Sequence, residues 1–185
     1  MDAITALTTR TSCPRLDAPG PSAEQLEVLL SAAIRAPDHG VLRPWRFIVL
    51  QGDERHALGN IMVAELLRKQ PEADQKAQDS AFAKALRAPT MVVAIAETVE
   101  NHKVPIWEQV LAVGAAVQNM MLAAHAMGLG AMWRTGDLAN SAEAKAALGF
   151  AEKDQVVAFL YLGTPAGPAR SIPAETASSF LRQIP

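Results

Sequence analysis

The pattern of apolar and polar positions changes its period several times along the chain. Apolar residues recur every three or four positions in several segments, which predicts helices at 2–8, 22–34, 55–68, 72–86, 107–127 and 142–148. Ser22 and Gln25 stand at capping-box spacing where the second of these begins, and Pro37 follows its end. Much of the chain is therefore expected to be helical.

Other segments are short, apolar and rich in β-branched or aromatic residues. They predict strands at 45–50, 90–96, 131–135 and 155–163. Helices and strands are mixed without a regular βαβ alternation, which favours an α+β fold with three or four strands under a helical shell. There is no internal repeat and no long linker, so residues 1–185 are expected to form one domain.

The helix expected at 107–127 carries almost no charge. No acidic or basic residue occurs between Gln109 and Trp133, a stretch long enough to span a membrane. Gln118, Asn119 and His125 interrupt it, and no basic flank precedes it, which argues against a membrane span. A helix that is apolar nearly all round must be covered on every side, so we expect a homodimer with this helix near its centre.

Composition excludes several classes of function. The 17 basic and 19 acidic residues give a net charge of −2, and no basic stripe interleaves with aromatic residues, so nucleic acid is not an expected partner. The single Cys13 excludes an internal disulfide, and no Cys or His spacing suggests a metal. The first residues, MDAITALTTR, do not resemble a signal peptide, so a reducing cytoplasm is the expected location.

Three segments far apart in the sequence offer candidate chemistry. RTSCPRL, 10–16, places hydroxyls between guanidinium groups, the donors that a phosphate or carboxylate requires; a solvated basic loop is the alternative. GLGAMWRTG, 128–136, has glycines that allow close approach of a ligand, and it leads to Arg134 in what should be core; a helix cap before a strand is the alternative. Trp133 and Arg134 are expected to point to opposite faces.

The third segment, APDHGVLRPWRFIVL, 36–50, sets Asp38, His39 and arginines directly before a buried strand. His39 could act as a base, a ligand or a stacked ring, or be merely half-exposed. Cys13 lies between arginines that favour a thiolate, but no histidine and acid are tied to it by a recognisable pattern. Together the three segments are compatible with one anionic ligand.

In combination, these segments resemble the FMN-dependent nitroreductases, and the compact bacterial members in particular. RTS at 10–12 is similar to the family's phosphate loop, and APDHGVLRPWRFIV to its Ala-Pro-Ser-x-x-Asn-x-Gln-Pro-Trp-x-Phe segment. GLGAMWRTG and FLYLGTP match its second half in order, and ENHKVPIWEQ, 100–109, looks specific to the compact subgroup. The resemblance covers nearly the entire chain. It implies a central mixed or antiparallel sheet flanked by helices in an intertwined homodimer.

The resemblance also implies two FMN molecules at the dimer interface, each held by both chains. The residues that it assigns to the cofactor are Arg10, Thr11, Ser12, Arg15, Trp133, Arg134 and Thr135 of one subunit, with Arg35, Pro37 and His39 reaching the flavin of the other. Compact members are further associated with a nicotinamide-cofactor stretch, which corresponds to Ala123, Ala124, His125, Ala126, Met127 and Gly128.

The implied activity is a ping-pong exchange in which NADH or NADPH delivers hydride to flavin N5 and an electron-poor acceptor, such as a nitroaromatic or a quinone, then takes the electrons. No side chain is required as a nucleophile. Two alternatives stay open. Asp38 and His39 stand where the family usually has serines, which keeps open a flavin-binding dimer without efficient turnover. A cysteine-dependent enzyme at Cys13 is the other.

Overall fold

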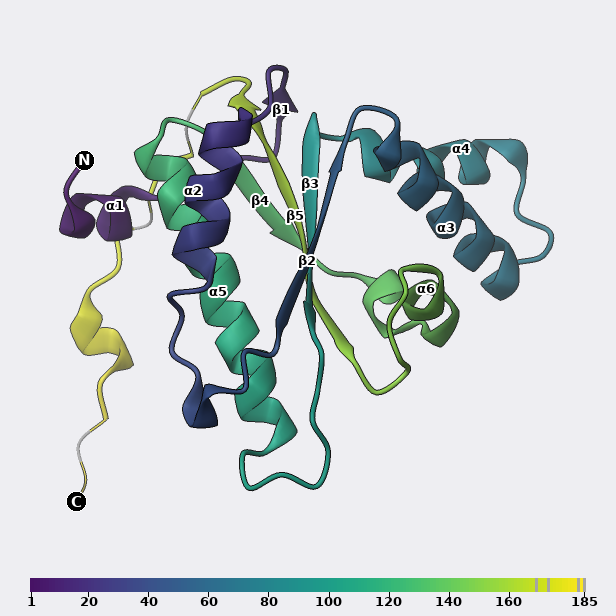
Figure 1. Cartoon of the computed structure of the whole chain (residues 1–185). Coiled ribbons are helices and arrows are strands. Elements are labelled where there is room, and N and C mark those ends of the chain that lie inside the picture. Colours follow the sequence, from purple (N-terminus) through teal and green to yellow (C-terminus); the bar gives the residue numbers. More distant parts are fainter. Residues whose placement is uncertain (169, 173, 183, 185) are drawn as a thin grey trace.

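The structure, a computed structural model, describes residues 1–168, 170–172, 174–182 and 184. Its centre is a five-stranded sheet in the order β1-β5-β3-β2, with β4 also paired to β5 (Figure 1). The strands are β1 (Leu16–Asp17), β2 (Trp45–Gln51), β3 (Thr90–Ala96), β4 (Gly130–Arg134) and β5 (Gln155–Pro165). Every pairing is antiparallel, so the sheet is antiparallel rather than mixed.

One face of the sheet is covered by α2 (Ala23–Ala33) and α5 (Ile106–Ala126), with α1 (Ala3–Thr9) beyond them. The predicted capping box is present at the start of α2, where Ser22 and Gln25 bond reciprocally. Alanines at 116 and 124 let α5 pack closely, and they share a core with Val92 and Leu160 of the sheet. The helix ends before Gly128, whose φ of +78° favours glycine.

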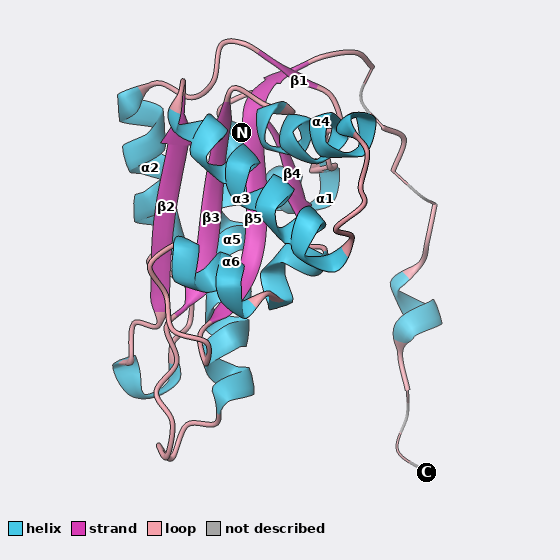
Figure 2. Cartoon of the chain, turned by 90° about the vertical axis from the view of Figure 1, so that its right-hand side faces the viewer, coloured by secondary structure: helices cyan, strands magenta, loops and turns pink. Residues whose placement is uncertain are grey.

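The opposite face carries α3 (Glu54–Lys69), α4 (Gln75–Ala83) and α6 (Ala142–Ala147). Figure 2 shows these helices in front of the sheet. Gly59 allows α3 and α4 to approach, since a Cβ there would lie 2.7 Å from the Phe82 ring. Single turns of 3-10 helix occur at His39–Val41, Lys84–Leu86, Asp137–Asn140 and Ala177–Phe180.

The predicted elements are confirmed with small differences at their ends, and two differences are larger. The sheet has five strands instead of three or four, because the two-residue β1 pairs with the end of β5 and is too short to show a period. The helix expected over 72–86 begins only at Gln75, where the Asp74 side chain accepts from the Ala77 amide. The long helix is α5, and among the described residues no helix is long and apolar enough to span a membrane.

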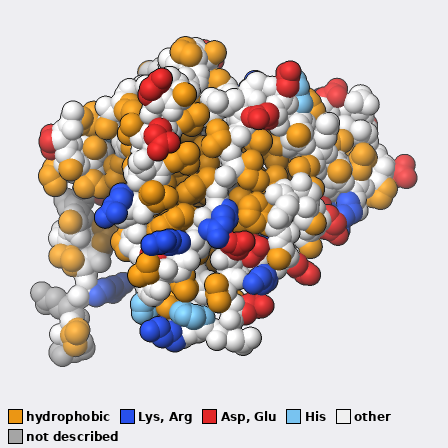
Figure 3. Space-filling view, in the orientation of Figure 1, with side chains coloured by type: hydrophobic (Ala, Val, Ile, Leu, Met, Phe, Trp, Pro, Cys, Tyr) orange, Lys and Arg blue, Asp and Glu red, His pale blue; other side chains and the backbone are white. Residues whose placement is uncertain are grey.

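Some apolar surface is left uncovered by this single chain. Figure 3 shows hydrophobic side chains gathered along the middle of one view, over the β2 edge of the sheet and between α2 and α3. Trp107 and Leu111, near the start of α5, are each 61 % exposed. The described part of the tail after β5 stands away from the body and exposes Phe180 and Leu181 (Figure 2).

Candidate functional site

A cavity of about 610 Å³ lies between α3 and the β4–β5 part of the sheet. Its sheet side is formed by Met132 of β4 and by Phe159 and Tyr161 of β5, since these positions all point to the α3 face. Met62 and Leu66 of α3 line the same cavity. One part of its wall is therefore apolar, which suits a flat aromatic body, and the rest is polar or charged.

Basic side chains surround this apolar space. Lys69, Lys84, Arg87 and Arg134 line the cavity, against the two acids Glu65 and Asp137. Within the part of the chain that the structure describes, the side chains of Lys84, Arg87 and Arg134 form no ion pair and no hydrogen bond. The cavity thus offers cationic donors without protein acceptors, an arrangement that favours a ligand with negative charge.

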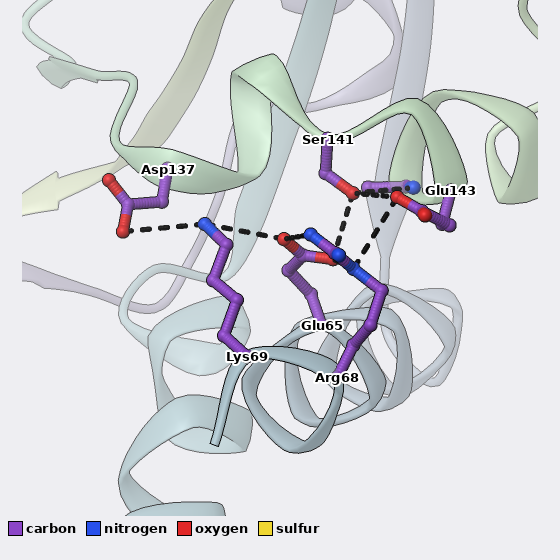
Figure 4. Close-up of polar contacts among 7 residues, drawn as sticks. Glu65, Arg68, Lys69, Asp137, Ser141 and Glu143 are labelled. Carbon is purple, nitrogen blue, oxygen red and sulfur yellow. Dashed lines mark hydrogen bonds and ion pairs between the residues drawn. The ribbon is translucent and has the colours of Figure 1, made fainter. Parts of the chain in front are cut away.

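Glu65, on the cavity wall, is the centre of a network of hydrogen bonds and ion pairs, which Figure 4 shows. Glu65 is 7 % exposed, and its carboxylate accepts from Nε and Nη2 of Arg68 at 2.9 Å and from the Ser141 hydroxyl at 2.8 Å. The hydrogen bonds from Arg68, with those of Ser141 and Lys69, lower the pKa of Glu65 to about 2 against the opposing effect of burial. Lys69 also lies 3.5 Å from Asp137. The network fixes α3 to the segment that follows β4.

A second hollow of about 560 Å³ adjoins the first, because Arg87 and Arg134 line both. Arg15 lines this hollow too, beside Ala166 and Gly167. A Cβ on Gly167 would lie 3.0 Å from an Arg15 guanidinium nitrogen, so glycine leaves room for that side chain. The structure therefore brings Arg15 and Arg134, predicted from distant segments, to one basic hollow together with Arg87.

The segment with Arg10, Thr11 and Ser12 runs beside β4, because the Cys13 amide donates to the Ala131 carbonyl at 2.9 Å. All three side chains are half-buried. Nη1 of Arg10 is buried without a hydrogen-bond partner among the described residues. A buried guanidinium nitrogen without an acceptor is unfavourable, and a phosphate oxygen would satisfy it.

β4 and its end present the last predicted group. Trp133 and Arg134 point to opposite faces, as expected: the indole packs with the α5 core, and its N–H donates to the Val157 carbonyl at 3.0 Å. Arg134 is half-exposed along the cavity, so the prediction of a charge buried in the core is wrong. The strand ends at the cavity, and Thr135 lies on its wall.

Arg35, Pro37 and His39 do not join this group within one chain. They are exposed around the end of α2, and His39 Nδ1 lies 2.6 Å from Glu108 of α5. The turn that follows is strained, since Val41 and Arg43 have φ values of 54° and 50°. The proposed reach of this turn to a second subunit stays a prediction.

The stretch Ala123 to Gly128 forms the last turn of α5 and its cap. His125 Nε2 lies 3.0 Å from the Thr9 hydroxyl of α1, and Ala124 is buried in the core. None of these positions lines the 610 Å³ cavity. The nicotinamide role of this stretch stays a prediction.

Sequence reasoning missed part of the site. Lys84 and Arg87 stand just before the second strand, and Tyr161 is the only tyrosine of the chain. The spacing of Lys84 and Arg87 was a usable signal, because both lie within one turn of each other directly before a buried strand. No group of three or more His, Cys, Asp or Glu in the described residues could hold a metal ion.

Comparison with known proteins identifies relatives over most of the chain. The model described as "Nitroreductase family" matches residues 7–164. "Putative NAD(P)H nitroreductase YdjA" of Escherichia coli K12 is 42 % identical over 165 residues, 89 % of each chain. "Putative NAD(P)H nitroreductase" of Haemophilus influenzae is 40 % identical over 168 residues, again 89 % of each chain.

Solved structures share the fold. A nitroreductase-like family protein from Bacillus cereus superimposes with a TM-score of 0.80 at 21 % identity, over 100 % of this chain and 96 % of the other. A putative nitroreductase from Desulfovibrio desulfuricans, crystallised in complex with FMN, gives a TM-score of 0.76 at 24 % identity, over 100 % and 98 %.

Proposed function

The chain belongs to the nitroreductase family, and we propose that it is an FMN-dependent NAD(P)H oxidoreductase that reduces nitroaromatics, quinones or similar electron-poor acceptors. The observation that carries the proposal is the unsatisfied Nη1 of Arg10, next to a strand whose far end opens on a cavity with unpaired basic side chains. FMN combines a phosphate with a flat aromatic ring, which are the two features that these groups suit. The YdjA relative is named for NAD(P)H, and the Desulfovibrio structure contains FMN.

The residues present fit this cofactor. Arg10, Thr11 and Ser12 would hold the phosphate end, because the guanidinium and the hydroxyls supply the donors and Nη1 of Arg10 has no competing acceptor among the described residues. Arg15, Arg87 and Arg134 surround the hollow beside them. Met132, Phe159 and Leu66 would contact the ring, with Thr135 at the cavity wall.

When bound, FMN would supply the hydride acceptance and electron donation that no side chain of this chain can perform. The chain's own part is to bind, to orient and to set the local charge. The unpaired guanidinium groups favour an anionic ligand over a neutral one, which stabilises the reduced form of a cofactor that gains negative charge. Apolar side chains on the sheet side, Met132 and Phe159, would pack against the ring and displace water from that part of the cavity.

We also propose that the protein works as a homodimer. Apolar side chains are exposed on α5, on the β2 edge and in the tail, and exposed apolar patches of this kind mark interaction surfaces. They include Trp107, Leu111, Phe180 and Leu181. A second copy would cover them. Arg35, Pro37 and His39 would then reach the cofactor site of the partner subunit, which would give the strained turn at Val41 a function.

In this proposal NADH or NADPH is the reductant, with Ala123–Gly128 beside its binding position, and a small molecule is the acceptor. A cytoplasmic location is proposed because the one cysteine gives no stabilising disulfide.

Cofactor binding and turnover are tested on the purified full chain. FMN fluorescence is titrated with protein, and the complex is then mixed rapidly with NADH or NADPH without oxygen. The proposal requires saturable binding, bleaching of the oxidised flavin band, and its return when a quinone or nitroaromatic is added. Binding without bleaching would support the flavin-binding dimer without turnover, and absence of binding would exclude both.

The shared site is tested with mixed chains. Arg35→Ala and Arg134→Ala chains are co-expressed with different tags, and heterodimers are isolated. If each site uses both subunits, a heterodimer has one intact site and one with both substitutions, so it binds one FMN tightly. Two equal sites in the heterodimer, or a monomer by sedimentation, would contradict the shared geometry.

A further inference from the structure

Tyr161 is a buried phenol on the floor of the cavity, and its polar atom is unused. Its residue is 4 % exposed, and it lines the cavity between α3 and β4. No hydrogen bond of its hydroxyl is formed within the ranges that the structure describes. Arg10 Nη1 is the polar side-chain atom of the described residues that is both inaccessible to solvent and without a hydrogen bond. The Tyr161 hydroxyl also has no hydrogen bond but remains accessible, so it faces the open space of the cavity. A tyrosine hydroxyl in such a place usually has a partner.

The surroundings of Tyr161 contain donors rather than acceptors. Arg87 and Arg134 lie close enough to act on the charge of the phenol, and neither has an acidic partner among the described residues. The nearest acids of the cavity are already engaged, since Glu65 accepts from Arg68 and Ser141, and Asp137 pairs with Lys69. Among the described residues, no acidic side chain of the cavity is therefore free to accept from the hydroxyl, and a ligand that displaces water from the cavity would supply an acceptor.

The phenol is a donor over the whole physiological range of pH. Burial raises the pKa of Tyr161 above its ordinary value, and the nearby Arg87 and Arg134 oppose this only in part. A neutral phenol can donate one hydrogen bond, whereas a phenolate could not. The two neighbouring guanidinium groups are permanently charged, so the three groups form a fixed set of donors.

The position of this set indicates which part of a ligand it meets. Met132 is the cross-strand partner of Tyr161, and Phe159 is its neighbour on the same face of β5, so apolar surface adjoins the hydroxyl. An aromatic ring that carries carbonyl oxygens on its edge matches an apolar floor with a donor beside it. In the proposed function the phosphate of FMN binds elsewhere, to Arg10, Thr11 and Ser12.

We propose that Tyr161 is a cofactor-binding residue whose hydroxyl, flanked by Arg87 and Arg134, donates a hydrogen bond to the carbonyl-bearing edge of the flavin ring. This inference rests on the proposed function, because it requires FMN in the cavity. The hydrogen bond strengthens as the ring gains negative charge on reduction, so the hydroxyl favours reduced over oxidised FMN.

The test uses the fact that Tyr161 is the only tyrosine. Its ionisation is followed in the full-length protein by the ultraviolet absorbance of tyrosinate without FMN, and by the single ring resonance of isotope-labelled tyrosine with and without FMN. We expect the apoprotein to titrate above the ordinary tyrosine pKa, and FMN to shift the resonance and move ionisation to still higher pH.

A pair of variants gives the second readout. Tyr161→Phe removes only the hydroxyl and should weaken FMN binding about two- to tenfold, with a fall in the midpoint potential of bound flavin. Thr90→Val is the matched control, because the Thr90 hydroxyl is also buried but accepts from Gln51 at 2.9 Å on β3, away from the cavity. The control should lower stability and leave FMN affinity and potential unchanged.

The outcomes separate this inference from the proposed function. If wild-type protein binds FMN while the tyrosine resonance does not move and Tyr161→Phe binds equally well, the role of Tyr161 is overturned and the proposed function stands. If wild-type protein does not bind FMN, both are overturned. If Tyr161→Phe and Thr90→Val weaken binding alike, the effect is one of stability, and the assigned hydrogen bond is refuted.

Discussion

The two faces of the sheet are built differently. On the α5 face, small apolar residues such as Ala116 and Ala124 pack against Val92 and Leu160, and α5 contacts β2, β3, β4 and β5 along its length. On the α3 face, α3 makes its main strand contacts with β2 alone. The β4–β5 end of that face is left open as a cavity of about 610 Å³.

The difference shows how one sheet can serve stability and binding at once. Close packing on the α5 face supplies the buried apolar area that stabilises the fold. On the α3 face the helix does not pack against β4 and β5, so the cations that line the cavity remain partly solvated. Partly solvated cations do not need an acidic partner. The candidate binding groups are therefore concentrated at the cavity, where α3 does not pack against β4 and β5.

The largest effect on stability is expected from a cavity created in the closely packed core on the α5 face. Leu160→Ala should lower the free energy of unfolding by about 2–5 kcal/mol, because the side chain is fully buried and its loss leaves a void. Leu66→Ala, on the cavity wall, should lose only about 1 kcal/mol, since that side chain already borders open space. Urea unfolding at one protein concentration without FMN measures both. Equal losses would contradict the contrast between the faces.

Loss of the charge network should weaken the α3 face in a pH-dependent manner. The pKa of Glu65 is about 2 in the folded state against an ordinary 4.5, so the ionised form stabilises the fold above pH 4.5. That contribution is lost as pH falls from 4.5 towards 2, and it amounts to about 1–3 kcal/mol because Arg68 is partly solvated. Glu65→Gln should show a lower urea midpoint at pH 7 and a smaller loss on acidification. Glu72→Gln is the control, because Glu72 is exposed and forms no ion pair or side-chain hydrogen bond with the described residues.

Removal of a cavity cation should affect ligand binding far more than folding. Arg134→Ala, and separately Arg10→Ala, should weaken FMN binding about tenfold to a hundredfold, as expected for a charge-assisted hydrogen bond. The unfolding midpoint should change little for Arg134→Ala, because its side chain has no partner among the described residues. Fluorescence titration gives the affinities. Unchanged affinity in both variants would refute the phosphate and ring assignments.

The smallest effect is expected outside both faces. Arg46 and Glu97 form an ion pair on the surface, with both side chains about half-exposed. Arg46→Ala should change the free energy of unfolding by less than about 1 kcal/mol, and added salt should reduce even that. Thermal unfolding at low and high salt measures the effect. If Arg46→Ala lowered the free energy of unfolding as much as Leu160→Ala, the expectation that an exposed ion pair contributes little to stability would be wrong.

Local patterns in the chain were sufficient for the elements and for part of the site. The capping box at Ser22, the buried run from Thr90 to Ala96 and the alternation of Trp133 and Arg134 each depend on near neighbours in sequence, and each is present. The loop at Arg10 and the arginine at the end of β4 stood out because charge and hydroxyls adjoin apolar segments. Family motifs then connected them to one cofactor.

By itself the sequence therefore determined the α+β class, most of the elements and the cationic character of the candidate site, because these follow from local periodicity and residue chemistry. Only the tertiary structure decided that Tyr161, Lys84 and Arg87 share a cavity with Arg134, and that Glu65 ties α3 to Ser141. It also placed Arg134 at a solvated cavity rather than in the core. These contacts depend on the antiparallel register of the strands and on the place where α3 does not pack against the sheet, and no short stretch of the sequence encodes either.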